Sequence, residues 1–232
     1  MTINVDNVKE LCQVYAQNPE TRARYSHCLY APAKEFTRRL FINEVGSAGI
    51  GRVLFLSGGA GSGKSALHHY MERQKRCLIL DGTLSSLAEA REQIRLALAC
   101  GNEVELIHVY CPVEKAVQAA IERAIKLGRG ISLESLARTH FHSQATFCDL
   151  VRQYFDHGEP VYFALLDNSN YSSPVFRDLS FLESHRYSDL KSVHEKAIHA
   201  FDSFLSLYQE KAGKPVPDFI KEAFRKPGRK VA

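Results

Sequence analysis

The chain has 232 residues, of which 45% are hydrophobic, and its 30 Lys and Arg residues against 26 Asp and Glu residues give a formal net charge of +4. This length suits one compact domain with a real core, while the modest charge and the lack of a long basic stripe with interleaved aromatics give little support for a nucleic-acid partner. The six cysteines are scattered without a C-x-x-C pair, so neither a disulfide framework nor a zinc site is expected. The first residues lack a signal-peptide pattern and no apolar run approaches the ~20 residues of a membrane span, so we expect a cytoplasmic protein without a membrane partner.

Residues 1–46 are expected to form an N-terminal helical segment. Apolar residues recur at helical spacing from Val5 to Tyr15, and a second helix is expected from about Pro32 to Val45. We interpret this segment as packing material, with its basic residues on solvated helix faces.

The most informative stretch follows the short apolar run Arg52–Ser57, which predicts a buried strand. It matches the pattern G-x-x-x-x-G-K-[ST], and a helix is expected to follow it over residues 66–73. A strand, a glycine-rich loop and a helix together predict a P-loop, whose backbone amides bind phosphates. The residues expected to bind ATP are Gly58, Gly59, Ala60, Gly61, Ser62, Gly63, Lys64 and Ser65. Within this loop, Lys64 would bridge the β- and γ-phosphates, and the Ser65 hydroxyl would bind Mg²⁺.

A second apolar run, residues 77–80, ends at Asp81 and is followed by Thr83. Polar residues at the carboxyl end of a parallel strand lie at the edge where such sheets bind ligands. Asp81 could therefore hold Mg²⁺ through water or accept a proton from a substrate hydroxyl. A helix cap or a turn is the alternative for Asp81, and for Thr83 the substrate-facing and structural interpretations stay open.

Strands and helices alternate through the rest of residues 47–170. Helices are expected over residues 86–99 and 112–127, and strands over 103–110 and 161–166. Short links between alternating elements predict an α/β fold of the three-layer P-loop NTPase, kinase-like type, with a parallel sheet flanked by helices. Residues 171–232 are expected to add a C-terminal helical extension, with helices near 188–210 and after Pro217.

A cluster of basic residues lies at the end of the helix over residues 112–127 and in the loop after it. A mobile lid could be formed by Arg123, Lys126 and Arg129, with the guanidinium groups of its arginines binding the transferring phosphoryl group. The alternative is that these cations simply complement the helix C-terminus. Their spacing does not decide between the two.

Taken together, these pieces resemble the zeta toxins, which are P-loop kinases of bacterial toxin–antitoxin systems. The resemblance runs from about Val53 to Asn170 and rests on Leu-Ser-Gly-Gly-Ala-Gly-Ser-Gly-Lys-Ser, Ile-Leu-Asp-Gly-Thr-Leu, Val-Tyr-Cys-Pro-Val-Glu-Lys-Ala, Glu-Arg-Ala-Ile-Lys-Leu-Gly-Arg-Gly-Ile and Asp167-Asn168. It implies transfer of the γ-phosphoryl of ATP, with Mg²⁺, to the 3′-hydroxyl of UDP-N-acetylglucosamine or to another small metabolite.

The resemblance also implies roles for individual residues. Lys64 and Ser65 would serve ATP and Mg²⁺, with Asn168 on the nucleotide side. Asp81 and Thr83 would face the acceptor, with Asp81 as the base or as a metal-orienting group. Two arginines would bind phosphates and stabilise the transition state: Arg123 and Arg129. A toxin of this kind would also need a small inhibitory protein, an antitoxin, as its partner.

One departure from the family pattern is clear. Zeta toxins carry a long insert between the P-loop helix and the Gly-Thr-Leu strand, and that insert contains an Asp-x-Asp-x-x-Arg-like strand end with the catalytic base. Here residues 66–80 are too few for a further strand and helix. Either Asp81 has taken over the role, or the acceptor differs, or the chain is a degenerate ATP-binding module that lacks transfer activity and regulates or binds a protein partner.

Overall fold

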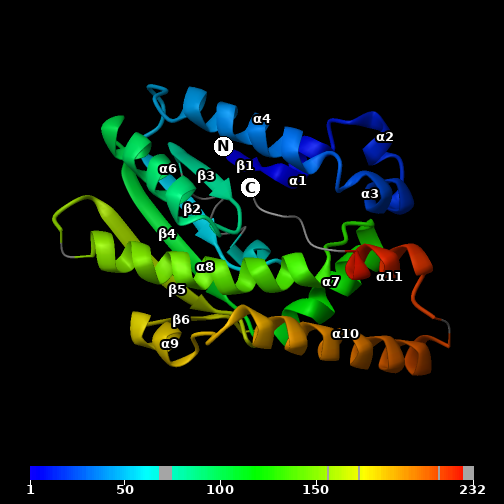
Figure 1. The fold of residues 1–232 in the computed structure, drawn as a ribbon. Coiled ribbons are helices and arrows are strands. Elements are labelled where there is room, and N and C mark those ends of the chain that lie inside the picture. Colours follow the sequence, from blue (N-terminus) through cyan, green and yellow to red (C-terminus); the bar gives the residue numbers. More distant parts are fainter. Residues whose placement is uncertain (68–74, 156, 172, 214, 227–232) are drawn as a thin grey trace.

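The computed structural model describes residues 1–67, 75–155, 157–171, 173–213 and 215–226. The strands are β1 (Thr2–Asn4), β2 (Arg52–Ser57), β3 (Cys77–Asp81), β4 (Glu103–Tyr110), β5 (Val161–Asp167) and β6 (Val175–Arg177). The helices are α1 (Val5–Lys9), α2 (Gln13–Ala16), α3 (Pro19–Tyr25), α4 (Tyr30–Glu44), α6 (Leu87–Ala99), α7 (Val113–Leu127), α8 (Leu133–Tyr154), α9 (Leu179–Ser184), α10 (Leu190–Ala212) and α11 (Asp218–Arg225), with a short 3₁₀ helix, η1 (Lys64–Leu67). Figure 1 shows their arrangement.

Within the described residues the sheet has six strands in the order β1-β3-β2-β4-β5-β6. Strands β1 to β5 run parallel, and β6 pairs with β5 in the antiparallel sense. Helices cover the sheet (Figure 1), so the predicted α/β fold with a parallel sheet flanked by helices is confirmed. In this order the P-loop strand β2 lies at the centre, between β3 and β4.

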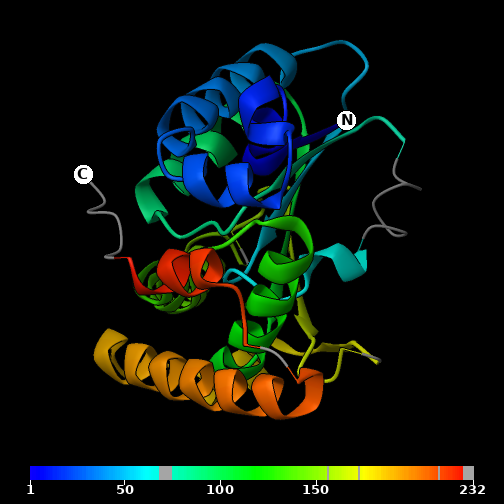
Figure 2. The same cartoon turned by 90° about the vertical axis from the view of Figure 1, so that its right-hand side faces the viewer.

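Alternating side chains of β2 build two separate apolar layers. Val53 and Phe55 are buried in the larger core, to which α4, α6 and α8 contribute. Leu54 and Leu56 face the other way and pack in a smaller cluster that includes Leu67 of η1. Figure 2 shows the three helices on one side of the sheet and η1 on the other. Both faces of β2 are therefore apolar, as its uninterrupted hydrophobic run predicts.

A second core joins the C-terminal helices to the rest of the molecule. Buried side chains of α7, α8, α10 and α11 form one cluster, in which the rings of Phe201 and Phe224 stack with their centroids 5.4 Å apart. Partly buried Ala60 of the P-loop packs against the same cluster. The C-terminal helices thus support the helices that carry the residues around the loop.

The predicted helices over residues 86–99 and 112–127 match α6 and α7, and those near 188–210 and after Pro217 match α10 and α11. Their ends follow local signals: the hydroxyl of Ser86 accepts the Glu89 N–H at the start of α6, and Gly128 ends α7 with φ +73°. The helix expected over residues 66–73 falls mostly outside the described residues. Among the described helices, none is both long enough and apolar enough to cross a membrane.

The expectation of helices alone in residues 1–46 is wrong at its first residues. Thr2–Asn4 forms β1, which extends the sheet beyond β3, and the Met1 carbonyl accepts the Ile79 N–H at 2.8 Å. The stretch from Val5 to Tyr15, expected as one helix, is divided between α1 and α2, and α3 begins at Pro19, where no helix was expected. The second expected helix matches α4. A strand this short satisfies its backbone groups by pairing with a distant strand, which local periodicity does not report.

Candidate functional site

The loop from Gly58 to Gly63 follows β2 directly and carries three glycines in the left-handed half of backbone space. Gly58, Gly61 and Gly63 have φ values of +134°, +78° and +86°. A Cβ on Gly61 would lie 2.4 Å from the carbonyl oxygen of Ala116 in α7, and one on Gly63 would lie 2.1 Å from the amide nitrogen of Asn168. These positions need glycine both for conformation and for space, as expected of a loop packed closely enough to form a phosphate cradle.

Lys64 reaches back over this loop. Its ammonium donates to the carbonyl oxygens of Gly58 at 3.0 Å and of Gly59 at 3.2 Å. Burial lowers the pKa of Lys64, while the negative charges of Asp81 and Asp6 act in the opposite direction. A partly desolvated ammonium held at a loop of this kind is suited to binding anionic phosphate oxygens.

Helix α8 braces the loop from one side. The Ala60 N–H donates to Thr139 Oγ1 at 3.0 Å, and His140 Nε2 lies 2.9 Å from the Ala60 carbonyl oxygen. Burial lowers the pKa of His140 to about 4, so this ring is neutral near pH 7. On β4, His108 is also buried, with its pKa lowered to about 3, and its Nδ1 lies 2.9 Å from the hydroxyl of Ser57. These neutral rings act as packing and hydrogen-bonding groups beneath the loop.

The opposite side of the loop is held by the segment after β5. Asn168 is fully buried, and its side-chain amide donates to the carbonyl oxygen of Ser62 at 2.8 Å. The hydroxyl of Tyr171 donates to the carbonyl oxygen of Gly61 at 2.7 Å. Asn168, expected on the nucleotide side, is thus placed against the P-loop backbone, where it fixes the loop's shape.

Asp81 ends β3 beside the P-loop strand, in register with Leu56. Its Oδ2 accepts a hydrogen bond from the side-chain amide of Asn4 at 2.6 Å. Thr83 contributes through its backbone, because its carbonyl oxygen accepts the Gly58 N–H at 3.3 Å, while its hydroxyl lies 3.1 Å from that of Ser85. The carboxylate of Asp81 is therefore at the ligand-binding edge, and Thr83 ties β3's end to the loop.

The two arginines expected to bind phosphates have different surroundings. Arg129 donates to Glu10 Oε1 through Nη2 at 2.6 Å and Nε at 3.2 Å, and Arg22 pairs with the same carboxylate at 3.0 Å. The positive charge of Arg123 acts to lower the pKa of both Lys64 and Asp6. Its buried Nε has no hydrogen-bond partner among the described residues. An orphaned guanidinium N–H of this kind fits an anionic ligand.

Predicted site residues thus fall into groups. The charges of Asp81 and Arg123 both act on the pKa of Lys64, whereas Arg129 is paired to Glu10. Ser65 is exposed in η1, next to Lys64. Among the described residues, no group of three or more His, Cys, Asp or Glu side chains is arranged to hold a metal ion. Magnesium at a nucleotide needs no such group, because it is usually bound through one or two protein ligands, substrate phosphates and water.

Several residues of this site are not predicted by the sequence pattern. They come from the N-terminal segment and from α8: Asn4, Asp6, Lys9, Glu10, Thr139 and His140. A strand of three residues has too little periodicity to be recognised, and the contacts of α8 with the loop join residues far apart in sequence. The spacing Asn4-x-Asp6-x-x-Lys9 after apolar Ile3 is a local signal for the residues of the N-terminal segment.

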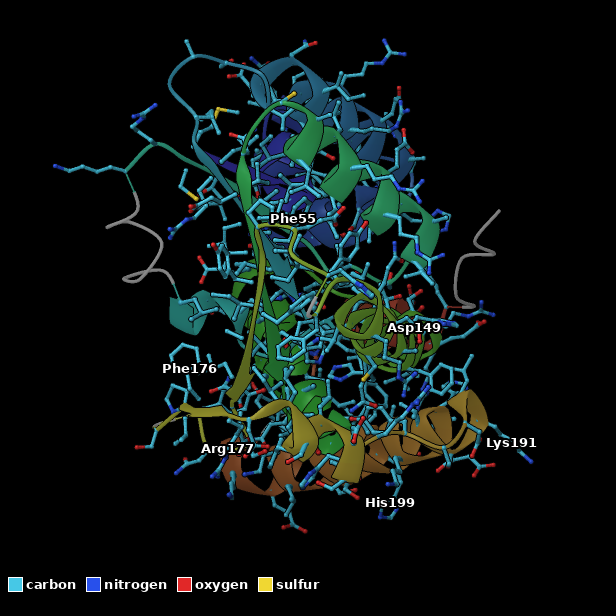
Figure 3. All side chains as sticks on the ribbon, turned by 90° about the vertical axis from the view of Figure 1, so that its left-hand side faces the viewer. Phe55, Asp149, Phe176, Arg177, Lys191 and His199 are labelled. Atoms are coloured by element: carbon cyan, nitrogen blue, oxygen red, sulfur yellow. The ribbon has the colours of Figure 1, made fainter. Side chains whose placement is uncertain are left out.

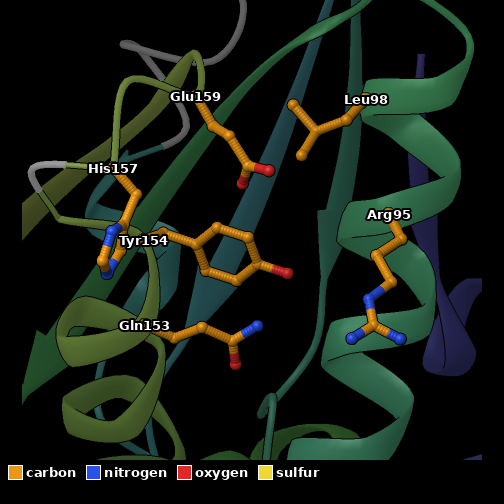
Figure 4. A pocket seen from close by; sticks show the side chains of 6 residues that line it. All are labelled: Arg95, Leu98, Gln153, Tyr154, His157 and Glu159. Carbon is orange, nitrogen blue, oxygen red and sulfur yellow. The ribbon is translucent and has the colours of Figure 1, made fainter.

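Two hollows on the surface lie away from the P-loop. One, of about 330 Å³, is lined by residues of α6, of the end of α8 and of the link to β5 (Figure 4), at the edge where the strands begin. The other, of about 400 Å³, lies between the end of β4 and the start of α10. Neither is lined by P-loop residues, so the constellation around Lys64 stays the candidate site.

Fold and site together define a P-loop kinase-like α/β protein. Residues 73–173 match the family model described as zeta toxin, which confirms the resemblance inferred from the motifs. The matched segment includes Asp81, Thr83, Arg123, Arg129 and Asn168 and begins after the P-loop. No curated protein matches the chain.

A solved structure, that of the native AvrRxo1-ORF1:-ORF2 complex, is similar to this chain with a TM-score of 0.52 and 11% sequence identity. The alignment covers 94% of this chain and 86% of that one. At this identity the similarity concerns the fold, and it extends over nearly the whole chain.

Proposed function

We propose that this protein is an ATP-dependent kinase of zeta-toxin type, which transfers the γ-phosphoryl group of ATP to a hydroxyl of a small metabolite. The observation that carries the proposal is the desolvated Lys64 ammonium, which is held at the glycine loop by a hydrogen bond to the Gly58 carbonyl oxygen. The charges of Asp81 and Arg123 both act on its pKa. Phosphoryl transfer depends mainly on positioning and on neutralising charge on the phosphate oxygens. Lys64 and Arg123 supply positive charge for this, and Asp81 would orient the metal ion. The family implies a nucleotide sugar such as UDP-N-acetylglucosamine as the acceptor class.

Each residue has a definite part in this proposal. The amides of residues 58–65 and the Lys64 ammonium bind the triphosphate. The Ser65 hydroxyl and Asp81 would hold Mg²⁺, which would supply positive charge to the phosphates. Arg123 stabilises the charge that develops on the γ-phosphate, and Arg129 joins it on leaving Glu10. Asn168 keeps the loop in shape, and Thr83 holds the end of β3 against the loop.

The setting of the protein belongs to the same proposal. All six cysteines are free thiols in the structure, and ATP and nucleotide sugars are intracellular metabolites, so we place the protein in the cytoplasm. An antitoxin-like inhibitory protein is the partner that a kinase of this family would need. The similar solved structure is itself a complex of two gene products.

A second candidate function is a degenerate ATP-binding module that regulates or binds a protein partner. It is motivated by hydrogen bonds within the protein that already occupy polar groups of the P-loop. Lys64 donates to loop carbonyls, and the Ala60 amide donates to Thr139. In such a module nucleotide binding would control docking, and transfer would be absent.

ATP consumption separates the two candidates. The purified protein, ATP and Mg²⁺ are incubated with a deproteinised metabolite extract and, separately, with UDP-N-acetylglucosamine, and new phosphorylated products are identified by mass spectrometry. The kinase proposal expects acceptor-dependent ADP formation that Lys64→Ala and Asp81→Ala abolish without loss of folding. Tight ATP binding with no acceptor-dependent phosphorylation would favour the module, and full turnover by Asp81→Ala would remove that residue's assigned role.

A further inference from the structure

The N-terminal strand β1 brings a second carboxylate to the ligand-binding edge of the sheet. It pairs in parallel with β3, with Asn4 in register with Asp81, and the Asn4 side chain donates to Asp81 Oδ2 at 2.6 Å. In a parallel sheet the residues that follow neighbouring strands meet at one edge. Asp6, two residues beyond Asn4, lies in the first turn of α1, which follows β1 at this edge.

Local contacts hold Asp6 in a defined orientation. Its backbone N–H donates to Asn4 Oδ1 at 2.7 Å, which caps helix α1, and its Oδ1 lies 2.9 Å from the ammonium of Lys9. Lys9 is 6% exposed, whereas the Asp6 side chain is 31% exposed. The buried Lys9 ammonium thus holds the Asp6 carboxylate in place while leaving it partly accessible to a ligand.

Asp6 also lies within the charge network of the P-loop. Its charge and that of Asp81 both raise the pKa of Lys64 against the effect of burial. Burial would by itself raise the pKa of Asp6, but the charges of Lys9, Arg123 and Arg129 outweigh it and keep this carboxyl ionised. The charge of Asp6 is therefore coupled to the charge of Lys64 and to those of the two arginines of the lid region.

The order of the strands assigns different tasks to the two carboxylates. Asp81 belongs to the strand directly beside the P-loop strand, where it is in register with Leu56. Asp6 follows β1, the next strand out, and neighbouring strands of a sheet lie roughly 5 Å apart. In phosphoryl transfer the attacking and leaving oxygens are roughly in line on opposite sides of the phosphorus. An acceptor hydroxyl therefore has to enter on the side away from the loop, which is the side of Asp6.

We infer that Asp6 is the residue that accepts the proton of the acceptor hydroxyl, and that strand β1 and helix α1 complete the active site. In this step the acceptor oxygen forms a bond to the γ-phosphorus of ATP, the bond from that phosphorus to the β,γ-bridging oxygen breaks, ADP leaves, and the proton passes to the Asp6 carboxylate. Asp81 is then the metal-orienting group. The inference rests on the proposed kinase function and supplies the base that residues 66–80 are too short to provide.

The test compares Asp6→Asn with Asp81→Asn and with a surface control, Asp149→Asn. Asp149 lies on α8 (Figure 3). It pairs with Arg152 in the same helix. ADP formation and labelled product are measured with ATP, Mg²⁺ and the two acceptor probes named above, UDP-N-acetylglucosamine and a deproteinised metabolite extract. ATP affinity and the Mg²⁺ concentration for half-maximal activity are measured in parallel.

We expect Asp6→Asn to lower acceptor-dependent transfer by about 100-fold or more, with ATP affinity and the Mg²⁺ requirement unchanged, as for loss of a general base. Asp81→Asn should instead raise the Mg²⁺ requirement, and the control should match wild type. Because Asp6→Asn leaves Lys9 buried without its partner, the double variant Asp6→Asn/Lys9→Met, which removes both charges, is the second test of the same loss.

The outcomes separate the inference from the proposed function. Transfer by wild type that survives both Asp6 variants would overturn the assignment of Asp6 and leave the kinase in place. Wild type that binds ATP yet transfers nothing to either probe would refute the kinase itself, and the role of Asp6 with it. Loss of transfer in folded Asp6 variants with unchanged Mg²⁺ dependence is the supporting result.

Discussion

The closest backbone contact of the P-loop gives a sharp test of the site's construction. Gly61 and Gly101 have the same φ of +78°, so an alanine at either meets the same left-handed strain, on the order of 1–2 kcal/mol. At Gly61 the new Cβ would lie 2.4 Å from the carbonyl oxygen of Ala116, whereas at Gly101 no atom of the described residues lies within 4 Å of it. The obstructing atom belongs to the backbone of α7 and cannot rotate away, so we expect a further ~1–3 kcal/mol at Gly61 alone.

Urea unfolding at unchanged m-value measures both losses, and titration with ATP and Mg²⁺ measures the consequence for binding. Gly61→Ala should lose about 3 kcal/mol of unfolding free energy and bind ATP at least about 10-fold more weakly, since the loop must shift relative to Lys64. Gly101→Ala should lose about 1 kcal/mol and bind ATP normally. Equal losses of stability in the two variants, together with unchanged ATP affinity in Gly61→Ala, would refute this account of the loop.

Three other predictions concern the charges around the loop. Lys64→Ala should weaken ATP binding by about 100-fold through loss of a desolvated charge, as calorimetry can measure, and an affinity like that of wild type would contradict its role. His140 and His108 have pKa values lowered to about 4 and about 3, so below pH 6.5 the unfolded chain binds protons that the folded protein does not. As the pH is lowered from 6.5 to about 4, the unfolding free energy should therefore decrease by about 1.4 kcal/mol per pH unit for each ring. The decrease should be less steep in His140→Gln, and an unfolding free energy that does not change with pH would refute the neutral rings. Glu10→Gln should cost about 1 kcal/mol in urea unfolding and tighten ATP binding by freeing Arg129, and unchanged affinity would show that this arginine does not reach the phosphates.

The central part of the fold could be predicted because its signals are local. The strand Arg52–Ser57 and the glycines after it carry their conformations in their own composition, and Gly128 ends α7 as its position predicts. Alternation of strands with amphipathic helices then predicts a parallel sheet, since a crossover helix returns the chain in the same direction. Asp81 follows from the same reasoning, because it ends the strand that neighbours the P-loop.

The lid region shows where local reasoning stops. Arg123 and Arg129 are six positions apart around the end of one helix, and their spacing alone allows either phosphate binding or helix capping. The structure separates them: Arg129 binds Glu10 of the N-terminal segment, while Arg123 keeps a buried N–H without a partner among the described residues. That distinction depends on a contact between residues far apart in the chain, which no periodicity within α7 can encode.

The N-terminal strand β1 shows the same limit more fully and explains what the short link after the P-loop means. A parallel sheet sets which carboxyl ends meet by strand order in space, and chain order does not enter. Residues 66–80 leave no room for an extra strand, yet the place beyond β3 is filled by residues that precede the P-loop in sequence. Asn4 then donates a hydrogen bond to Asp81, and the charge of Asp6 acts on the pKa of Lys64, although both residues precede the loop in the chain. The absence of a long insert after the P-loop therefore does not deprive the site of its second carboxylate, because the edge of the sheet can receive that carboxylate from residues before or after the loop.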